Sequence, residues 1–259
     1  LLRMIRFDNV IKEFSGKPVL RGFNLHVHKG ETISLVGTSG AGKSVTLKHM
    51  VRLLKPTSGT VSIDGQPIND LDGDELARVR TRFGYLFQSA ALLQWYSVYE
   101  NVALPLREKT KLSNSEIDSR VRTVLEKVGL LEAADKLPAS ISGGMQKRAG
   151  LARAVVTRPD ILLYDEPTSG LDPVTSRTID ELIFELQRDL GVTSVVVTHD
   201  MISALTISDR IAMLHQGTVV EVSPPREFLL SKNEIIRNFL DSQCIHKDFF
   251  KDFPERNLK

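Results

Sequence analysis

The chain reads Gly37-Thr38-Ser39-Gly40-Ala41-Gly42-Lys43-Ser44 between an apolar run at 32–36 and a helix-prone segment at 45–50. This spacing, G-x-x-x-x-G-K-[ST], lets successive backbone N–H groups turn toward phosphate oxygens in a loop that opens onto a helix N-terminus. The lysine of such a loop reaches the β- and γ-phosphates, and its last hydroxyl ligates Mg²⁺. With a strand before it and a helix after it, the octapeptide predicts a nucleoside triphosphate site rather than a glycine-rich surface turn.

Length and composition are those of a globular protein. The chain has 259 residues, of which 41% are hydrophobic and 25% are charged, which suits one α/β ATPase domain with an inserted subdomain. No stretch approaches the roughly 18 uninterrupted apolar residues that a membrane helix needs. We therefore expect any membrane association to come through a partner.

Net charge and cysteine content argue against several classes of site. A net charge of +2 provides no broad attraction for nucleic acid, so we expect no nucleic-acid partner. Cys244 is the single cysteine of the sequence, which excludes an internal disulfide and every multi-cysteine metal site.

Short apolar runs alternate with helical patterns along the chain, which is typical of parallel strands joined by crossover helices. The turns Asp64-Gly65 and Gln216-Gly217 predict that the early and late strands are antiparallel and flank a parallel core. The sequence thus predicts an α/β fold with a mixed sheet. The expected strands lie at 4–10, 23–28, 32–36, 60–64, 83–87, 161–165, 194–198, 210–214 and 218–222.

Strand patterns stop between Phe87 and Pro159. Within this stretch, segments 116–128 and 144–157 carry apolar residues at helical spacing. We interpret residues 89–159 as a helical subdomain inserted into the ATPase domain.

The ATPase domain is expected to span residues 1–225, followed by a short helical extension and tail at 226–259. Apolar residues at 226–240 fall mostly on one helix face, which predicts a helix there. From Lys247 onward the chain is highly charged, and we expect a frayed end. The alternative is that the aromatic residues of this end, Phe249, Phe250 and Phe253, dock on the rest of the chain.

A second chemical motif is the apolar run 161–164, which ends in Asp165 and Glu166. Asp165 would hold Mg²⁺ through a water, as an enzyme with a phosphate-binding loop requires. Glu166 points in a different direction, where it can polarise the water that attacks the γ-phosphorus, so it is the candidate general base. Alone, the motif would be interpreted as two solvated acids at a strand end. Because the chain also contains the phosphate-binding motif at 37–44, we favour the catalytic interpretation.

A third motif is Ile141-Ser142-Gly143-Gly144-Met145-Gln146, which opens a helix that continues through 147–154. A serine and two glycines at a helix start are a weak signal alone, because serine is a favoured N-cap. Their hydroxyl and N–H groups nevertheless make a second anion site, which the loop at 37–44 does not require. In order with the other two motifs, this one resembles the signature of ABC ATPases.

The resemblance covers residues from about 5 to 222 and implies the P-loop NTPase fold of this family, with ATP and Mg²⁺ as ligands. It also implies a head-to-tail dimer, in which the signature of one copy closes over the ATP held by the P-loop of the other. Ser142, Gly143 and Gly144 would then contact nucleotide.

Four further positions acquire roles from the resemblance. Gln88 resembles the Q-loop glutamine, which senses Mg²⁺ and the attacking water, and His199 resembles the switch histidine that contacts the γ-phosphate. Asp172 lies in a run similar to the D-loop, which crosses the dimer interface. Phe14 stands where the family places an aromatic ring that stacks on adenine. The alternatives are an ordinary polar Gln88, a structural loop histidine and a core phenylalanine.

Two departures from the general ABC pattern bear on the subfamily. Ile141 and Met145 replace leucine and glutamine in the signature, and neither change removes the serine or the glycines. Phe14 replaces the commoner tyrosine and still offers a π-face. With the runs at 142–148, 164–173 and 197–201, Met145 gives a resemblance to the ATPases of Mla/Mce lipid-transport systems.

That resemblance implies an ATPase at the cytoplasmic face of the inner membrane, bound to an integral-membrane permease. The complex would move phospholipid or a related hydrophobic molecule and include a periplasmic Mce-type lipid-binding protein. The alternatives are the ATPase of an amino-acid, metal or drug transporter, and a soluble ABC ATPase of DNA or ribosomes. The last lacks support, because the sequence contains neither a coiled coil nor a second nucleotide domain.

The permease would dock beside the Q-loop, on residues 90–106. An apolar loop cluster in this segment suits a docking surface, although it suits the core of the helical subdomain equally well. The cluster comprises Leu92, Leu93, Trp95 and Tyr96.

Overall fold

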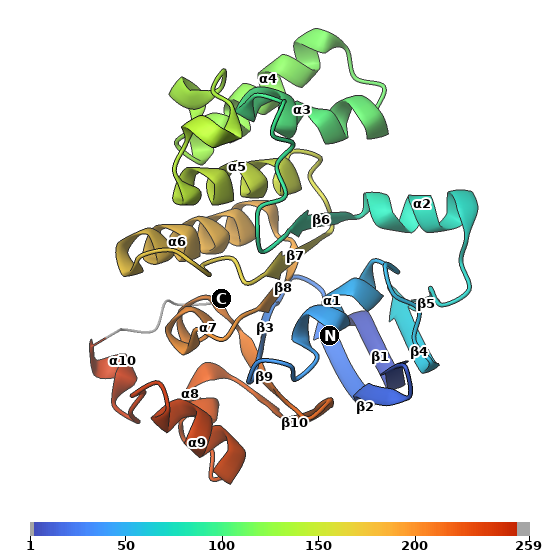
Figure 1. Cartoon of the computed structure of the whole chain (residues 1–259), viewed down its shortest axis with the longest axis vertical. Helices are drawn as coiled ribbons and strands as arrows, with labels where there is room; N and C mark the ends of the chain where they lie inside the picture. Colours follow the sequence, from blue (N-terminus) through green and yellow to red (C-terminus); the bar gives the residue numbers. More distant parts are fainter. Residues whose placement is uncertain (1–2, 253–259) are drawn as a thin grey trace. The chain divides into compact units, whose positions relative to one another are not determined.

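The computed structural model describes residues 3–252 and consists of two compact units (Figure 1). The first unit is built from the residues up to Arg80 together with those from Thr193 onward, and the second spans Thr81–Val192. The boundaries expected from the sequence, at 89–159 and 225, differ from this division and remain predictions. No helix of the described range 3–252 is long and apolar enough to cross a lipid bilayer.

An antiparallel sheet forms one layer of the first unit. Its strands β1 and β2 form a long hairpin around Ser15 and Gly16, and both residues have a positive φ. The short strand β5 was not predicted, because two residues are too few to show an alternating pattern. In spatial order the sheet contains β2 (Lys17–His28), β1 (Arg3–Phe14), β4 (Ser58–Ile63) and β5 (Gln66–Pro67).

A mixed sheet carries the phosphate-binding loop of the first unit. β3 (Thr32–Val36) is parallel to β8 (Thr193–Val197) and β9 (Arg210–His215), and β10 (Thr218–Ser223) is antiparallel to β9. Every residue of β3 and β8 is buried, as the uninterrupted apolar pattern of these strands requires. The predicted mixed α/β sheet with flanking antiparallel strands is therefore confirmed.

Helices of the first unit connect these strands. The helix-prone segment at 45–50 belongs to α1 (Lys43–Met50), and α7 (Met201–Ile207) follows β8. α2 (Gly73–Thr81) begins with Asp74 and Glu75 in its first turn, where carboxylates favour a helix N-terminus.

The C-terminal extension forms α8 (Pro225–Leu229), α9 (Glu234–Asp241) and α10 (Phe249–Asp252). The predicted extension is therefore helical, but its apolar segment at 226–240 forms two helices rather than one continuous helix. The chain leaves the helix after α8, and the Asn233 side chain caps a new helix by accepting a hydrogen bond from the N–H of Ile235 at 2.9 Å.

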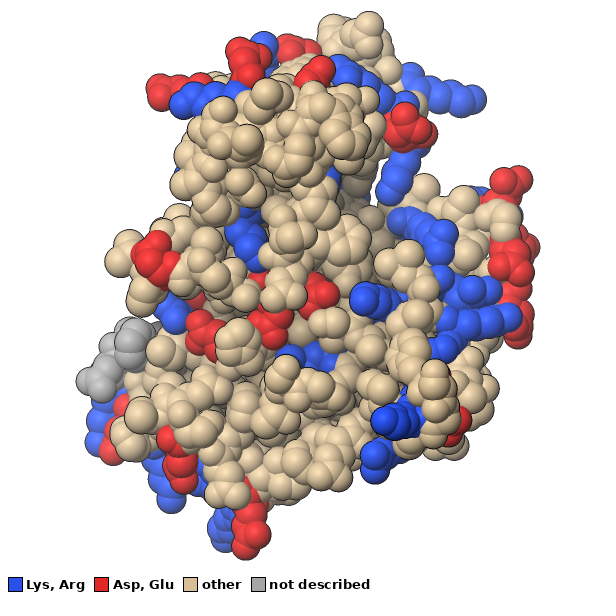
Figure 2. All heavy atoms as spheres, viewed as in Figure 1, with Lys and Arg blue, Asp and Glu red and all other residues tan. Residues whose placement is uncertain are grey.

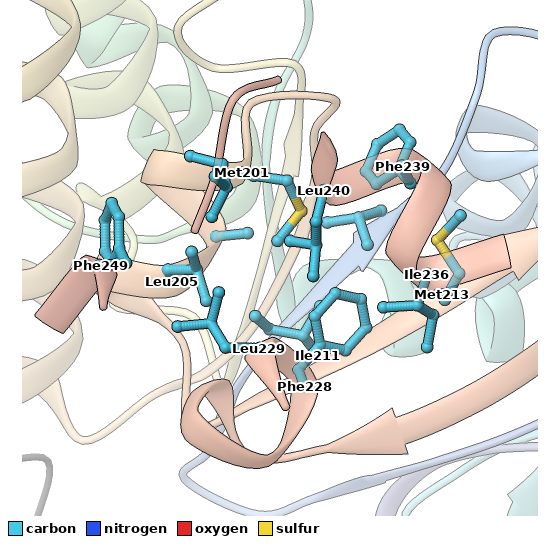
Figure 3. Close-up of a cluster of buried hydrophobic side chains, with 13 residues drawn as sticks. Met201, Leu205, Ile211, Met213, Phe228, Leu229, Ile236, Phe239, Leu240 and Phe249 are labelled. Carbon is cyan, nitrogen blue, oxygen red and sulfur yellow. The ribbon is translucent and has the colours of Figure 1, made fainter. Parts of the chain in front are cut away.

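The extension packs its apolar side chains onto the mixed sheet and α7 (Figure 3). Phe249 belongs to this cluster and is buried, so the expected fraying from Lys247 onward does not hold at this residue. Phe253 lies outside the described residues. The cluster includes Met201, Leu205, Ile211, Met213, Phe228, Leu229, Ile236, Phe239 and Leu240.

The second unit combines two parallel strands with four α-helices. β6 (Phe83–Leu86) pairs with β7 (Ile161–Asp165). Residues 89–159 contain α3 (Val98–Lys109), α4 (Asn114–Lys127), α5 (Gly143–Val155) and two 3₁₀ turns, and α6 (Pro173–Leu190) follows β7. Ser97 and Ser113 start α3 and α4 with capping boxes. α4 and α5 coincide with the predicted helices at 116–128 and 144–157.

Candidate nucleotide-binding and catalytic site

The loop at 37–44 begins at a position that only glycine fits. Gly37 has a φ of 152°, and a Cβ added there would lie 2.2 Å from the carbonyl oxygen of Leu214 on β9. Gly42 has a φ of 106° and caps α1, and this cap makes no side-chain hydrogen bond. Because the loop ends at a helix N-terminus without a capping side chain, its geometry suits a phosphate group.

Lys43 lies over the loop that precedes it. Its Nζ donates hydrogen bonds to the carbonyl oxygens of Gly37 at 2.8 Å and Thr38 at 3.2 Å. The lysine is 8% exposed, and these two hydrogen bonds place its charge beside the loop. Ser44 follows in the first turn of α1 and offers a hydroxyl oxygen, a ligand type that Mg²⁺ accepts.

His199 leaves the same edge of the mixed sheet as the phosphate-binding loop. β3 and β8 are parallel, Leu35 is paired with Val197, and the N–H of Thr198 donates to the carbonyl of Leu35 at 3.2 Å. The loops after both strands therefore start at one carboxyl edge, the place where open α/β sheets bind ligands. His199 is exposed.

Phe14 lies at the end of β1 and is 42% exposed. The alternative of a core phenylalanine is therefore wrong. The Nζ of Lys12 lies 5.0 Å from the centroid of its ring, within cation–π distance. The exposed ring is suited to stacking on a nucleobase.

In the second unit, the Q-loop and the two carboxylates also follow neighbouring parallel strands. Leu86 of β6 is paired with Tyr164 of β7, so Gln88 and Glu166 follow the same edge. Asp165 is 8% exposed and Glu166 is half-buried, with a left-handed φ of 49°. Because carboxylate oxygens are preferred ligands of Mg²⁺, Asp165 fits its predicted role.

Tyr85 of β6 lies near the carboxylate of Asp165, which the sequence pattern did not indicate. Burial raises the pKa of its hydroxyl, and the negative charge of Asp165 raises that pKa further. The phenol therefore stays protonated beside the carboxylate at neutral pH. Its ring stacks on Phe87 at a centroid distance of 4.1 Å.

Lys147 joins two of the predicted residues and was also missed. Its Nζ donates hydrogen bonds to the main-chain carbonyls of Gln88 at 2.5 Å and Glu166 at 3.0 Å. Burial lowers the pKa of this ammonium, while the charges of Glu166 and Asp165 raise it. In the sequence, the only sign of this role is that Lys147 stands three residues after the second glycine of the signature.

The signature motif opens α5. Ser142 is its N-cap, with an Oγ that accepts a hydrogen bond from the N–H of Met145 at 3.3 Å. Ser142 and Gly143 are exposed, whereas Gly144 is buried. Ser142 and Gly143 therefore lie exposed at the positive end of this helix.

Asp172 caps α6 by accepting hydrogen bonds from the N–H groups of Val174 and Thr175, both at 3.0 Å. Its second oxygen accepts from the Thr175 hydroxyl at 2.5 Å. These bonds hold the pKa of the Asp172 carboxyl below its usual range, with the Thr175 hydroxyl bond contributing most. In this structure the residue is a helix cap, and its nucleotide contact remains a prediction.

The loop and its buried lysine define a P-loop ATPase, and the exposed signature at the start of α5 is the predicted second anion site. Residues 20–169 match the ABC transporter family, and the chain belongs to this family. It is an ATP-binding, ATP-hydrolysing subunit of an ABC transporter.

Two curated relatives resemble most of the chain. It is 41% identical to "Methionine import ATP-binding protein MetN 1" of Pseudomonas fluorescens, over 96% of this chain and 77% of the relative. It is equally 41% identical to "Probable ribonucleotide transport ATP-binding protein mkl" of Mycobacterium leprae, over 93% of this chain and 70% of the relative.

Two solved structures share the fold. The dimeric structure of MJ0796, a bacterial ABC transporter cassette, matches with a TM-score of 0.80 and 38% identity, over 86% of this chain and 99% of the cassette. CbiO1 of Clostridium perfringens, part of the transporter complex cbiONQ, matches with a TM-score of 0.82 and 31% identity, over 93% and 95%.

Proposed function

We propose that this chain drives a permease that moves phospholipid or a related hydrophobic molecule across the cell envelope. The observation that carries the proposal is the signature Ile141-Ser142-Gly143-Gly144-Met145, in which methionine replaces the usual glutamine. This variant resembles the Mla/Mce ATPases. The same resemblance supports a location at the cytoplasmic face of the inner membrane and a periplasmic Mce-type protein in the complex.

The nucleotide would be held by groups at both anion sites. Lys43 and the N–H groups at the start of α1 bind the phosphates, and Phe14 stacks on adenine. Ser142 and Gly143 of a second copy meet the γ-phosphate from the other side, because these groups are exposed at the start of α5. The dimeric MJ0796 cassette supports a pair of copies, and the head-to-tail arrangement is part of the proposal.

Hydrolysis would depend on positioning and charge, since phosphoryl transfer asks little covalent chemistry of the protein. Glu166 accepts the proton of the attacking water, Gln88 orients that water, and His199 contacts the γ-phosphate. Mg²⁺, held by Ser44, Gln88 and Asp165, would neutralise charge on the β- and γ-phosphates. Loss of phosphate removes the bonds that join the two copies, so the dimer reopens and the permease changes state.

The permease would dock on the second unit. Trp95 is 72% exposed, which argues against the alternative that it belongs to the core of the helical subdomain. A groove of about 390 Å³ in the same unit is lined by the apolar side chains of Phe87, Leu104 and Pro105 and by the charged side chains of Glu108, Lys109 and Arg153. An exposed tryptophan is typical of an interaction surface.

Import of an amino acid is the second candidate function. The relative named for methionine import is 41% identical over 96% of this chain. The motifs that hydrolyse ATP do not distinguish the two functions, because the substrate path lies in the permease. On the face shown in Figure 2, basic side chains are interspersed with acidic ones, which favours either transporter over a nucleic-acid machine.

The test is to purify the affinity-tagged chain from detergent-solubilised membranes of its native cell and to identify accompanying proteins and lipids by mass spectrometry. A permease with an Mce-type protein and bound phospholipid is the expected result. A permease with a solute-binding protein would instead support amino-acid import. Recovery only in soluble fractions, with ribosomes or DNA, would contradict transport altogether.

A further inference from the structure

One face of the signature helix α5 contacts the Q-loop along its length. Lys147, Gly150 and Arg153 are spaced three residues apart and therefore share a face. Lys147 donates to the carbonyl of Gln88, and Arg153 donates to the carbonyl of Ala90 at 2.6 Å. Between them, a Cβ added to Gly150 would lie 3.0 Å from the Cβ of Ala90, so the backbones approach closely.

The segments that this face touches have strained backbones. Ala90, Ala91 and Glu166 have φ angles of 59°, 47° and 49°, in the left-handed region that favours glycine. Such conformations persist where the surroundings hold them in place, and they concentrate at functional sites. Arg153 donates to the carbonyls of Ala90 and Ala91, and Lys147 donates to that of Glu166.

Lys147 is the residue of this face that also contacts the loop after β7, at Glu166. The ammonium is 5% exposed and donates to Gln88 and Glu166, whose carbonyls belong to loops 78 positions apart in the sequence. Burial of an ammonium is costly. An apolar side chain of the same length would avoid that cost, but it would leave both carbonyls without this donor.

We propose that Lys147 is a positioning residue for ATP hydrolysis, which fixes the backbones of Glu166 and Gln88 relative to each other. This inference rests on the proposed role of Glu166 as general base. Because Lys147 lies on the helix that Ser142 opens, the anion site of the signature and the catalytic carboxylate are joined by one rigid element. Contact of that anion site with a second copy's nucleotide would thereby be coupled to the placement of Glu166.

The first test is Lys147→Met in the full chain, which preserves length and removes the charge and the donors. We expect kcat to fall about tenfold or more, since small misplacements of catalytic groups are costly, while the Kd for ATP stays within about twofold. Lys147→Arg retains donors and should recover most of the loss. The matched control is Lys127→Met, which removes a half-exposed lysine paired with Asp189 and should leave kcat unchanged.

A double-mutant cycle with Glu166→Gln separates positioning from a general structural role. If Lys147 acts mainly through Glu166, Lys147→Met causes a much smaller fold-loss of the residual single-turnover rate in the Glu166→Gln background than in the original chain. The same fold-loss in both backgrounds, or an unchanged kcat in Lys147→Met alone, would overturn the proposal.

Two other outcomes remain informative. Normal turnover by Glu166→Gln alone would refute the proposed general base, which is distinguishable from a failure of the Lys147 inference. If Lys147→Met does not fold, Lys147→Arg and Lys147→Gln provide the comparison. The arginine variant should then have the higher kcat at equal ATP affinity, and equal kcat values would contradict the inference.

Discussion

Gln243 holds the backbone of His199 through its side-chain amide. Its Nε2 donates to the carbonyl oxygen of His199 at 2.9 Å, and its Oε1 accepts from the N–H of Met201 at 3.1 Å. Asp200, between these two residues, caps α7. The C-terminal extension thus fixes the loop that carries the predicted switch histidine.

Replacing Gln243 should therefore slow hydrolysis without touching nucleotide. Gln243→Leu removes hydrogen bonds that hold the His199 loop. If the activation free energy of hydrolysis rises by about 1 kcal/mol as a result, kcat falls about fivefold. Steady-state ATPase assays measure this change. Gln66→Leu, at an exposed glutamine of β5, is the control and should keep the original rate. Equal rates for both variants would show that the extension does not support the His199 loop.

Glu166→Gln should retain ATP binding and lose turnover, because the amide cannot accept the proton of the attacking water. We expect kcat to fall at least about a hundredfold, the usual contribution of a general base. The variant should also accumulate as an ATP-bound dimer, measured by size-exclusion chromatography with light scattering. Glu185→Gln, at an exposed glutamate of α6, should behave like the original chain in both assays.

Lys43→Ala should weaken ATP binding about tenfold to a hundredfold, because the loop loses its charged contact with the phosphates. Isothermal titration calorimetry measures the Kd. Lys48→Ala is the matched control, since this lysine lies on the same helix and is exposed. An unchanged Kd in the Lys43 variant would contradict the assignment of the loop.

His49 should make the folded state sensitive to mild acid. It is 1% exposed, its Nδ1 lies 2.6 Å from the carbonyl oxygen of Val45, and burial lowers the pKa of its ring. A lowered folded-state pKa means that the unfolded chain takes up the proton first as the pH falls. Stability is therefore lost below about pH 6.5, the ordinary pKa of histidine.

His49→Asn tests this dependence, because an amide can still donate to Val45 but does not titrate. Urea unfolding at a series of pH values should show a smaller loss of the free energy of unfolding on acidification than in the original chain. The variant should be less stable at pH 7, since a smaller side chain leaves a cavity. Parallel losses in both proteins would show that other groups cause the acid sensitivity.

Trp95→Ser should weaken the association with the permease. Truncating a central aromatic of an interface costs about 2 kcal/mol or more, which is about thirtyfold in affinity. Co-purification from membranes measures the loss, and the melting temperature should not change because Trp95 is exposed. Leu53→Ser, at another exposed apolar residue, should retain the permease.

Local sequence patterns were sufficient where one segment contains the whole signal. The strands of the mixed sheet were predictable because buried parallel strands are continuous apolar runs. The loop at 37–44 was predictable because its function requires glycine and lysine at a set spacing. The C-terminal break before Asn233 and the two-residue β5 were missed, because neither changes the hydrophobic pattern over a full turn or strand.

The sequence by itself determined the family and the α/β class and predicted the residues that would contact nucleotide, since each depends on residue types at short spacings. Only the tertiary structure decided how these residues are supported. Lys147 and Gln243 stabilise the loops of Glu166 and His199 through main-chain carbonyls. Every residue type has the same main-chain carbonyl, so the type of residue at 166 or 199 does not reveal that its carbonyl is hydrogen-bonded.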